Sequence, residues 1–197
     1  MSDSAKEALA RLLRDFAQRP KPIQVVKKSA YWHQRAAGMA LFAVTFGGQR
    51  TYLSHYVTTL GHTIYVPDDF DDWPAAYSIE VLRHEAVHVS QFERYGWIGM
   101  VLLYGVLPFP MGLAWFRARF EWEAYEETLW AVAEIEGIDA ARSPDLRAKI
   151  VRRFTGPDYG WMWPFPRVIE RWIDKTLSEI EKTPDGKRPS TSAPRMR

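Results

Sequence analysis

The sequence predicts an α+β fold in which a small, mostly antiparallel sheet is followed by a mainly helical C-terminal part. Residues 41–66 are rich in β-branched and aromatic side chains, arranged in short runs that glycines separate. From residue 77 onward, apolar side chains recur instead at the three- and four-residue spacing of a helix. The 197 residues are 47% hydrophobic, which is enough for a sizeable core, and we expect a single domain over residues 1–182.

Local signals place the N-terminal elements. Ser4 and Glu7 form a capping box that opens a first helix, and Pro20 ends it. The dipeptides Gly47-Gly48 and Gly61-His62 suit tight turns between strands. We therefore expect strands over residues 41–46, 52–60 and 63–66, followed by an acidic loop over residues 68–72.

Four further helices are expected, each with a recognisable stop or apolar stripe. Gly96 and Gly137 are suited to end the first two, because glycine adopts the left-handed conformation that terminates helices. The basic, proline-rich stretch 183–197 is predicted to be a disordered tail. The expected helices cover residues 77–95, 117–136 and 144–154, and a final amphipathic helix includes residues 168–180.

The stretch from Tyr95 to Phe116 contains no charged residue, which raises the question of a membrane span. Pro108 and Pro110 interrupt it near its middle and leave two legs that are too short to cross a bilayer. We expect an apolar hairpin over residues 97–116 that packs on the protein. The alternative is a hairpin that inserts into a membrane surface.

Composition excludes several classes of function. The formal net charge is only +2 and the chain shows no nucleic-acid-reading motif, so we expect no nucleic-acid partner. The chain has no cysteine, and a metal site must therefore use histidine and carboxylate ligands. The N-terminus lacks the apolar core of a signal peptide, and we expect a cytoplasmic protein, with membrane association as the alternative.

The segment His84-Glu85-Ala86-Val87-His88 is the most informative one for function. Residues four apart lie on one face of a helix, so His84 and His88 are placed to hold one zinc ion. Zinc lowers the pKa of a bound water to about 7, and Glu85 is placed to accept its proton as general base. The motif thus predicts a metal-dependent hydrolase.

A catalytic zinc site usually has three protein ligands, so a third donor is needed from elsewhere in the chain. The richest source is the run Glu121 to Glu127, on the helix that follows the apolar segment. In this respect the chain resembles the gluzincin metallopeptidases, in which a His-Glu-x-x-His helix precedes a helix bearing a glutamate ligand. That glutamate commonly begins a Glu-x-x-(Ala or Ser)-Asp pattern. Glu121 followed by Ala124 matches the pattern in phase, and Glu123 is the reserve ligand.

The resemblance covers roughly residues 50–130 and implies a zincin-like fold, bound Zn²⁺ and a peptide or protein substrate. Tyr125 stands where the group usually has an aspartate that orients a ligand histidine. The wider pattern, with Gln91 three residues after His88, is also similar to uncharacterised bacterial proteins of metallopeptidase type. These likenesses name no particular substrate.

Other interpretations remain open at this point. His84 and His88 are also compatible with two helix histidines that bind nothing, and Glu121 with a salt-bridged helix face near Arg117. Two alternatives remain. One is a binding or scaffold domain that keeps a zincin fold without turnover, and the other is a metalloprotease that associates with a membrane surface. The lone histidines are predicted to have ordinary roles, and two tyrosines are candidate oxyanion donors: His33, His55 and His62, and Tyr125 and Tyr159.

Overall fold

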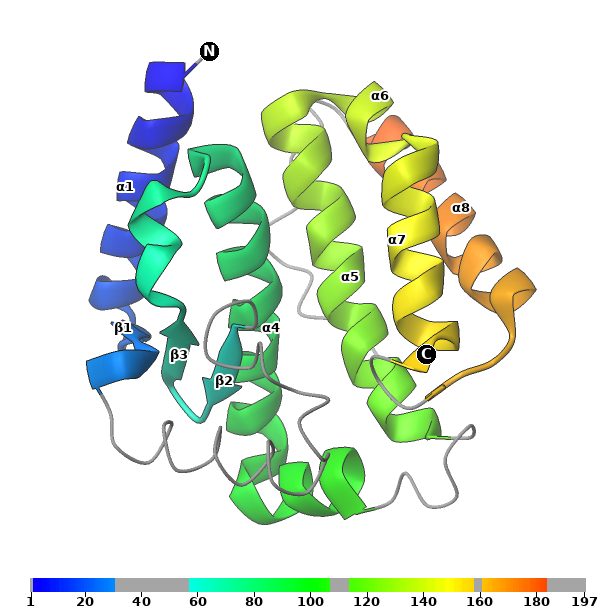
Figure 1. The fold of residues 1–197 in the computed structure, drawn as a ribbon, viewed down its shortest axis with the longest axis horizontal. Coiled ribbons are helices and arrows are strands. Elements are labelled where there is room, and N and C mark those ends of the chain that lie inside the picture. Colours follow the sequence, from blue (N-terminus) through cyan, green and yellow to red (C-terminus); the bar gives the residue numbers. More distant parts are fainter. Residues whose placement is uncertain (1, 31–56, 107–113, 158–160, 184–197) are drawn as a thin grey trace. The chain divides into compact units, whose positions relative to one another are not determined.

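The computed structural model describes residues 2–30, 57–106, 114–157 and 161–183 (Figure 1). It contains two compact units, Met1–Ser90 and Gln91–Arg197, and the boundary falls inside helix α4 (Ala75–Met100). The architecture is α+β, as predicted from the sequence. The single domain over residues 1–182 stays a prediction. The expected strand 41–46, the prolines at 108 and 110 and the tail beyond residue 183 lie outside the described residues.

The first unit contains a three-stranded mixed sheet in the order β1-β3-β2. Strand β1 (Gln24–Lys27) runs parallel to β3 (Thr63–Val66), whereas β2 (Thr58–Leu60) runs antiparallel to it. The prediction of a mostly antiparallel sheet is therefore wrong for the described strands. It failed because β1 has only four residues, too few for a period-two pattern to be recognised between the end of the first helix and the lysine pair.

Strand β3 has the bounds that the sequence predicted, and β2 falls within the expected strand 52–60. The turn between them is at Gly61, whose φ of 60° favours glycine. The acidic stretch Asp68–Asp72 was predicted to be a loop, but it forms the 3₁₀ helix η2. A second 3₁₀ turn, η1 (Lys28–Ala30), follows β1.

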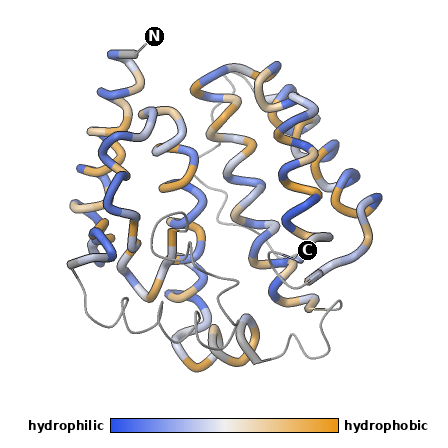
Figure 2. The backbone as a smooth tube through the Cα atoms, viewed as in Figure 1, coloured by the Kyte–Doolittle hydropathy of each residue, from blue (hydrophilic) through white to orange (hydrophobic). Residues whose placement is uncertain are grey.

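Helix α1 (Ser2–Gln18), strand β3 and helix α4 share the hydrophobic core of the first unit. Figure 2 shows α1 as an alternation of hydrophilic and hydrophobic residues, the pattern of a helix that buries one face. Removing these side chains from water is the main stabilising contribution to this unit. The buried members of its core are Phe16, Ile23, Ile64, Val66, Phe70, Leu82 and Val89.

Helix α4 carries the histidine motif and changes direction at Gly96. That residue has φ 66° and ψ 175°, a conformation that interrupts the helix where the sequence predicted its end. The chain then resumes a helical course to Met100 and continues as the π-helical segment η3 (Val101–Val106). The first leg of the expected apolar hairpin is thus helical, and residues 107–113 between its legs are outside the described part of the chain.

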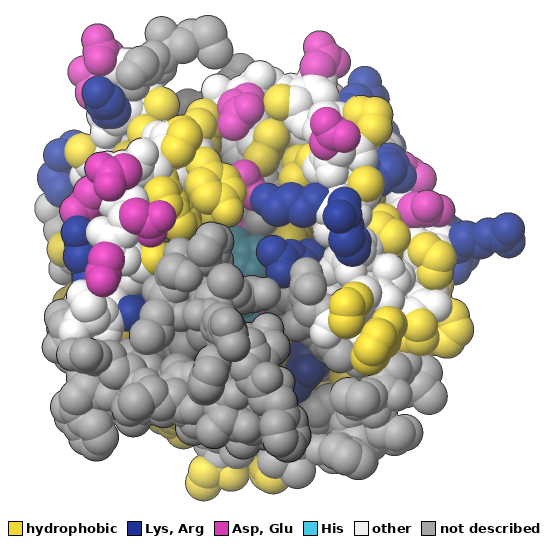
Figure 3. Space-filling model, viewed as in Figure 1, with side chains coloured by type: hydrophobic (Ala, Val, Ile, Leu, Met, Phe, Trp, Pro, Cys, Tyr) yellow, Lys and Arg dark blue, Asp and Glu magenta, His cyan; other side chains and the backbone are white. Residues whose placement is uncertain are grey.

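Large hydrophobic side chains are exposed in the second unit. Figure 3 shows hydrophobic side chains (yellow) interspersed with lysine and arginine side chains (dark blue) on one face of the molecule. No helix among the described residues is long and apolar enough to cross a membrane. The exposed residues of the second unit include Trp97, Ile98, Leu102, Trp115, Phe116, Trp161 and Phe165.

Four helices build the rest of the second unit: α5 (Trp115–Glu136), α6 (Ile138–Ala141), α7 (Pro144–Thr155) and α8 (Pro166–Lys182). Helices α5, α7 and α8 confirm the three helices predicted for this region, and α5 ends at Gly137 as expected. Their core is strongly aromatic: Trp122, Tyr125 and Phe154 are buried in it, together with aliphatic side chains of α8.

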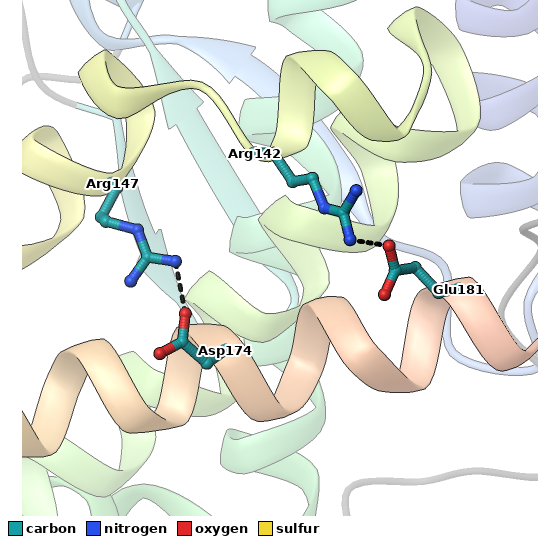
Figure 4. A network of polar contacts seen from close by, with 4 residues as sticks. All are labelled: Arg142, Arg147, Asp174 and Glu181. Carbon is teal, nitrogen blue, oxygen red and sulfur yellow. Dashed lines mark hydrogen bonds and ion pairs between the residues drawn. The ribbon is translucent and has the colours of Figure 1, made fainter.

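Ion pairs on the surface join α8 to the two preceding helices. Arg147 of α7 pairs with Asp174 of α8, and Arg142, at the end of α6, pairs with Glu181 of α8 (Figure 4). Solvent-exposed pairs of this kind contribute little to stability. The second unit is therefore held mainly by its buried aromatic and aliphatic side chains.

Candidate metal centre

Helix α4 places its two motif histidines on one face. The ring centroids of His84 and His88 are 5.2 Å apart, and the two ring planes meet at 76°. His88 is 9% exposed, and His84 is half-buried. The helical setting that the motif requires is therefore present.

Glu121 of α5 completes a group of three side chains that could hold a metal ion. One ligand atom from each of His84, His88 and Glu121 lies within 4.8 Å of the other two. Two imidazole nitrogens and one carboxylate oxygen form a donor set that zinc accepts in catalytic sites. The side chains that the sequence selected thus lie close together, and their chemistry fits a divalent transition metal.

Gln91, in the part of α4 that belongs to the second unit, is hydrogen-bonded to α5. Its side chain lies three residues after His88 and is almost fully buried. The Nε2 group donates to the carbonyl oxygen of Phe120 and to Oε2 of Glu123, each at 3.0 Å. The contact explains why the two glutamates differ: Glu123 is bound by Gln91, while Glu121 lies with the histidines.

Glu121 is only 1% exposed, which is unusual for a carboxylate. A buried charge is costly unless it is hydrogen-bonded, paired or bound to a metal. The phenol hydroxyl of Tyr104, in η3, donates to Oε1 of Glu121. This bond is one contact that compensates the buried carboxylate for its loss of water.

Glu85 is held by the sheet. Thr59 of β2 donates its hydroxyl hydrogen to Oε2 of Glu85 at 2.6 Å. Glu85 is 8% exposed, so water has little access to its carboxylate. The strand next to the motif helix therefore orients the side chain that the sequence predicts to be the general base.

A buried lysine adds positive charge near Glu85. Lys28 is the first residue of η1, directly after β1, and is 1% exposed. Burial lowers its pKa from 10.5 to about 8, and the negative charge of Glu85 opposes this by raising it. At neutral pH the lysine is charged, and its positive charge is attracted by the carboxylate of Glu85.

Other candidates from the sequence are placed differently. Tyr125, considered as an oxyanion donor, packs against Phe154 in the hydrophobic core of the second unit, with ring centroids 5.6 Å apart. The carbonyl of His62 accepts a hydrogen bond from the Gln24 amide, which gives this turn residue a structural role. Further sequence candidates lie outside the described residues: His33, His55 and Tyr159.

Sequence reasoning missed Thr59, Lys28 and Tyr104 as members of the centre. A threonine in a strand and a lysine in a pair of lysines carry no pattern that links them to a glutamate on a distant helix. Tyr104 had a weak signal, because it is a polar group inside an otherwise apolar, charge-free stretch. Such a group usually has a hydrogen-bond partner when it is buried.

The chain matches no protein-family model, no curated protein and no solved structure.

Proposed function

We propose that the protein is a zinc-dependent metallopeptidase. His84, His88 and Glu121 hold the metal, and Glu85 is the general base. The observation that carries the proposal is the grouping of one ligand atom from each of these three side chains within 4.8 Å, beside the glutamate of the same motif. The resemblance to gluzincins, which the order of the two motifs suggests, supports a peptide or protein substrate.

When bound, zinc supplies a Lewis acid that lowers the pKa of a water in its open position to about 7. Glu85 takes one proton from the water whose oxygen adds to the carbonyl carbon of the scissile peptide. It then passes this proton to the leaving amine nitrogen as the C–N bond breaks. Thr59 keeps the Glu85 carboxylate in a defined orientation during both transfers.

Two measurements on the same preparations test this function. Metal content is determined after gentle purification, and hydrolysis is followed on a mixed peptide library by mass spectrometry. Glu85→Gln should keep zinc but lower hydrolysis by about 100-fold or more, since it removes the general base. Glu93→Gln is the matched control, because Glu93 is an exposed glutamate of the same helix.

The outcomes separate the competing functions. Hydrolysis that survives in Glu85→Gln contradicts the mechanism. Zinc bound at the centre without cleavage of any peptide in the wild type favours a scaffold domain with a structural metal.

A location at a membrane surface is a second candidate, and exposed apolar side chains favour it. Trp97, Ile98 and Leu102 are 57%, 78% and 48% exposed, and all three come from the charge-free stretch 95–116. Exposure of several large apolar side chains within a few residues is a feature of lipid- or protein-binding surfaces. In this form of the proposal the peptidase acts close to a lipid surface.

A further inference from the structure

The carboxylate of Glu121 is oriented by a tyrosine from outside the sequence motifs. Tyr104 donates its phenol hydrogen to Oε1 of Glu121. A carboxylate that binds a metal through one oxygen is positioned by the hydrogen bonds made to its other oxygen. The bond from Tyr104 therefore restricts the rotation of the Glu121 side chain.

Tyr104 is itself fixed by neighbours on α5. The Nε group of Arg117 donates to the Tyr104 carbonyl oxygen at 3.1 Å, and its guanidinium carbon lies 5.2 Å from the centre of the Tyr104 ring. On α5, the ring of Phe120 is nearly parallel to that of Tyr104, at 7° and 6.5 Å. Two contacts with the Arg117 side chain and one aromatic contact thus define where the phenol hydroxyl points.

The backbone around Tyr104 is also unusual. Tyr104 lies in the π-helical segment η3, which has a wider hydrogen-bond spacing than an α-helix and often occurs at functional sites. Such a segment rotates side chains away from the positions that a continuous α-helix would give them. In this segment the hydroxyl group of Tyr104 reaches the carboxylate of Glu121.

From these contacts we propose that Tyr104 is a positioning residue of the metal centre, which holds Glu121 in its coordinating orientation, with Arg117 holding Tyr104. The inference rests on the proposed metal centre, and assigns to the apolar segment a role in metal affinity.

Tyr104→Phe tests the role because it removes the hydroxyl group and keeps the ring that stacks on Phe120. Zinc affinity is measured by competition with a chromophoric chelator at constant pH. We expect the dissociation constant to rise by about 10- to 100-fold, the usual effect of losing a group that orients a metal ligand. Tyr95→Phe is the control, since Tyr95 also packs on Phe120, at 5.0 Å, and should change affinity by less than about twofold.

A spectroscopic readout separates positioning from a general loss of structure. The metal-free variants are first shown to unfold at the wild-type temperature, and each is then loaded with Co²⁺. The visible absorption of the cobalt-loaded protein should change in Tyr104→Phe and stay as in the wild type in Tyr95→Phe, because only the former alters the coordination of the carboxylate.

The results distinguish this inference from the proposed function. A wild-type protein that binds zinc tightly, beside a Tyr104→Phe variant with the same affinity and cobalt spectrum, would overturn the role of Tyr104 alone. A wild-type protein that binds neither zinc nor cobalt would overturn the metal centre, and the role of Tyr104 with it.

Discussion

The hydroxyl of Thr59 donates to the carboxylate of Glu85 at 2.6 Å, which ties strand β2 to the motif helix at the residue beside His84. The pair joins residues 26 positions apart in the sequence. Its consequence is that a strand of the small sheet orients the general base of the proposed reaction. The hydroxyl also lies 3.5 Å from the backbone oxygen of Glu85, so Thr59 is close to the helix itself.

Removing this hydroxyl should slow hydrolysis without loss of metal. We expect Thr59→Val to lower kcat by about 10- to 100-fold, because a misoriented base costs rate even when it is present. Thr59→Ser keeps the donor and should remain within about threefold of the wild type on the same scale. Steady-state kinetics on a cleaved peptide, with zinc content measured in parallel, check both values. Equal rates in Thr59→Val and Thr59→Ser would contradict a role for the hydrogen bond.

Glutamates 121 and 123 should respond differently to the same change. Glu121→Gln replaces a charged ligand by a neutral amide and is expected to weaken zinc binding by at least about 100-fold. Glu123→Gln can still accept a hydrogen bond from Gln91 through its amide oxygen, and should bind zinc like the wild type. Competition titrations with a chelator measure both. Loss of zinc in Glu123→Gln together with its retention in Glu121→Gln would reverse the assignment.

Lys28 makes the stability of the metal-free protein depend on pH. Its pKa is about 8 in the folded protein and about 10.5 in the unfolded chain, so the unfolded state binds more protons between these values. The free energy of unfolding should therefore rise with pH across this window. Below pH 8 the folded protein carries the full cost of the buried charge, and the rise amounts to about 3 kcal/mol at most.

The matched variant for this prediction is Lys28→Met, which keeps the length of the side chain and removes the titrating group. Urea denaturation is followed at several pH values from 7 to 10.5 in the presence of a chelator. The difference in unfolding free energy between wild type and variant should shift in favour of the wild type as pH rises. A difference that stays constant over this range would show that the pKa of Lys28 is not lowered.

Gly96 should resist substitution for reasons of backbone conformation alone. A Cβ at this position would meet no atom within 4 Å, but the residue has φ 66°. Gly96→Ala is therefore expected to destabilise the protein by about 1–3 kcal/mol, because φ 66° with ψ 175° is a backbone conformation that essentially only glycine adopts. Gly96→Asn should cost about as much, since asparagine tolerates the left-handed helical region, where ψ is near 45°, and not this one. Thermal and urea denaturation measure both, and an alanine variant as stable as the wild type would contradict the kinked path of α4.

The membrane-surface form of the proposal makes its own prediction. The wild type should float with anionic liposomes, and a triple serine variant at Trp97, Ile98 and Leu102 should not, because it loses the exposed apolar side chains. The control is a double serine variant at Trp161 and Phe165, which are exposed in the second unit but lie outside the charge-free stretch, and which should float like the wild type. Wild-type protein that stays entirely in the soluble fraction would contradict membrane association.

Local patterns were sufficient for most of the fold. The bounds of β3, the helix that carries the motif and the end of α5 at Gly137 follow from turn chemistry, periodicity and the conformational freedom of glycine. Strand β1 could not be predicted, because four residues carry too little pattern and their parallel pairing with β3 is a long-range contact. The helical course of the chain after Gly96 was also not predicted. Glycine interrupts the helix there, as expected, but the chain then continues as a helical segment.

The residues of the candidate centre also fall into two groups, those that the sequence indicated and those that only the structure reveals. Spacing indicated His84, Glu85 and His88, and the resemblance to gluzincins indicated Glu121. The residues that orient them, Thr59 for Glu85 and Tyr104 for Glu121, act through single hydrogen bonds made across the fold. Such contacts leave no periodic signature in one sequence, so only the three-dimensional arrangement reveals them.

Zinc titration of the metal-free wild type beside His88→Ala tests the central claim most directly. The wild type should bind one zinc ion per chain with a dissociation constant well below a micromolar, and His88→Ala should bind at least about 100-fold more weakly, because it loses one of three ligands. Identical binding by the two proteins, or no binding by either while both remain folded, would show that the paired histidines and Glu121 do not form a metal centre.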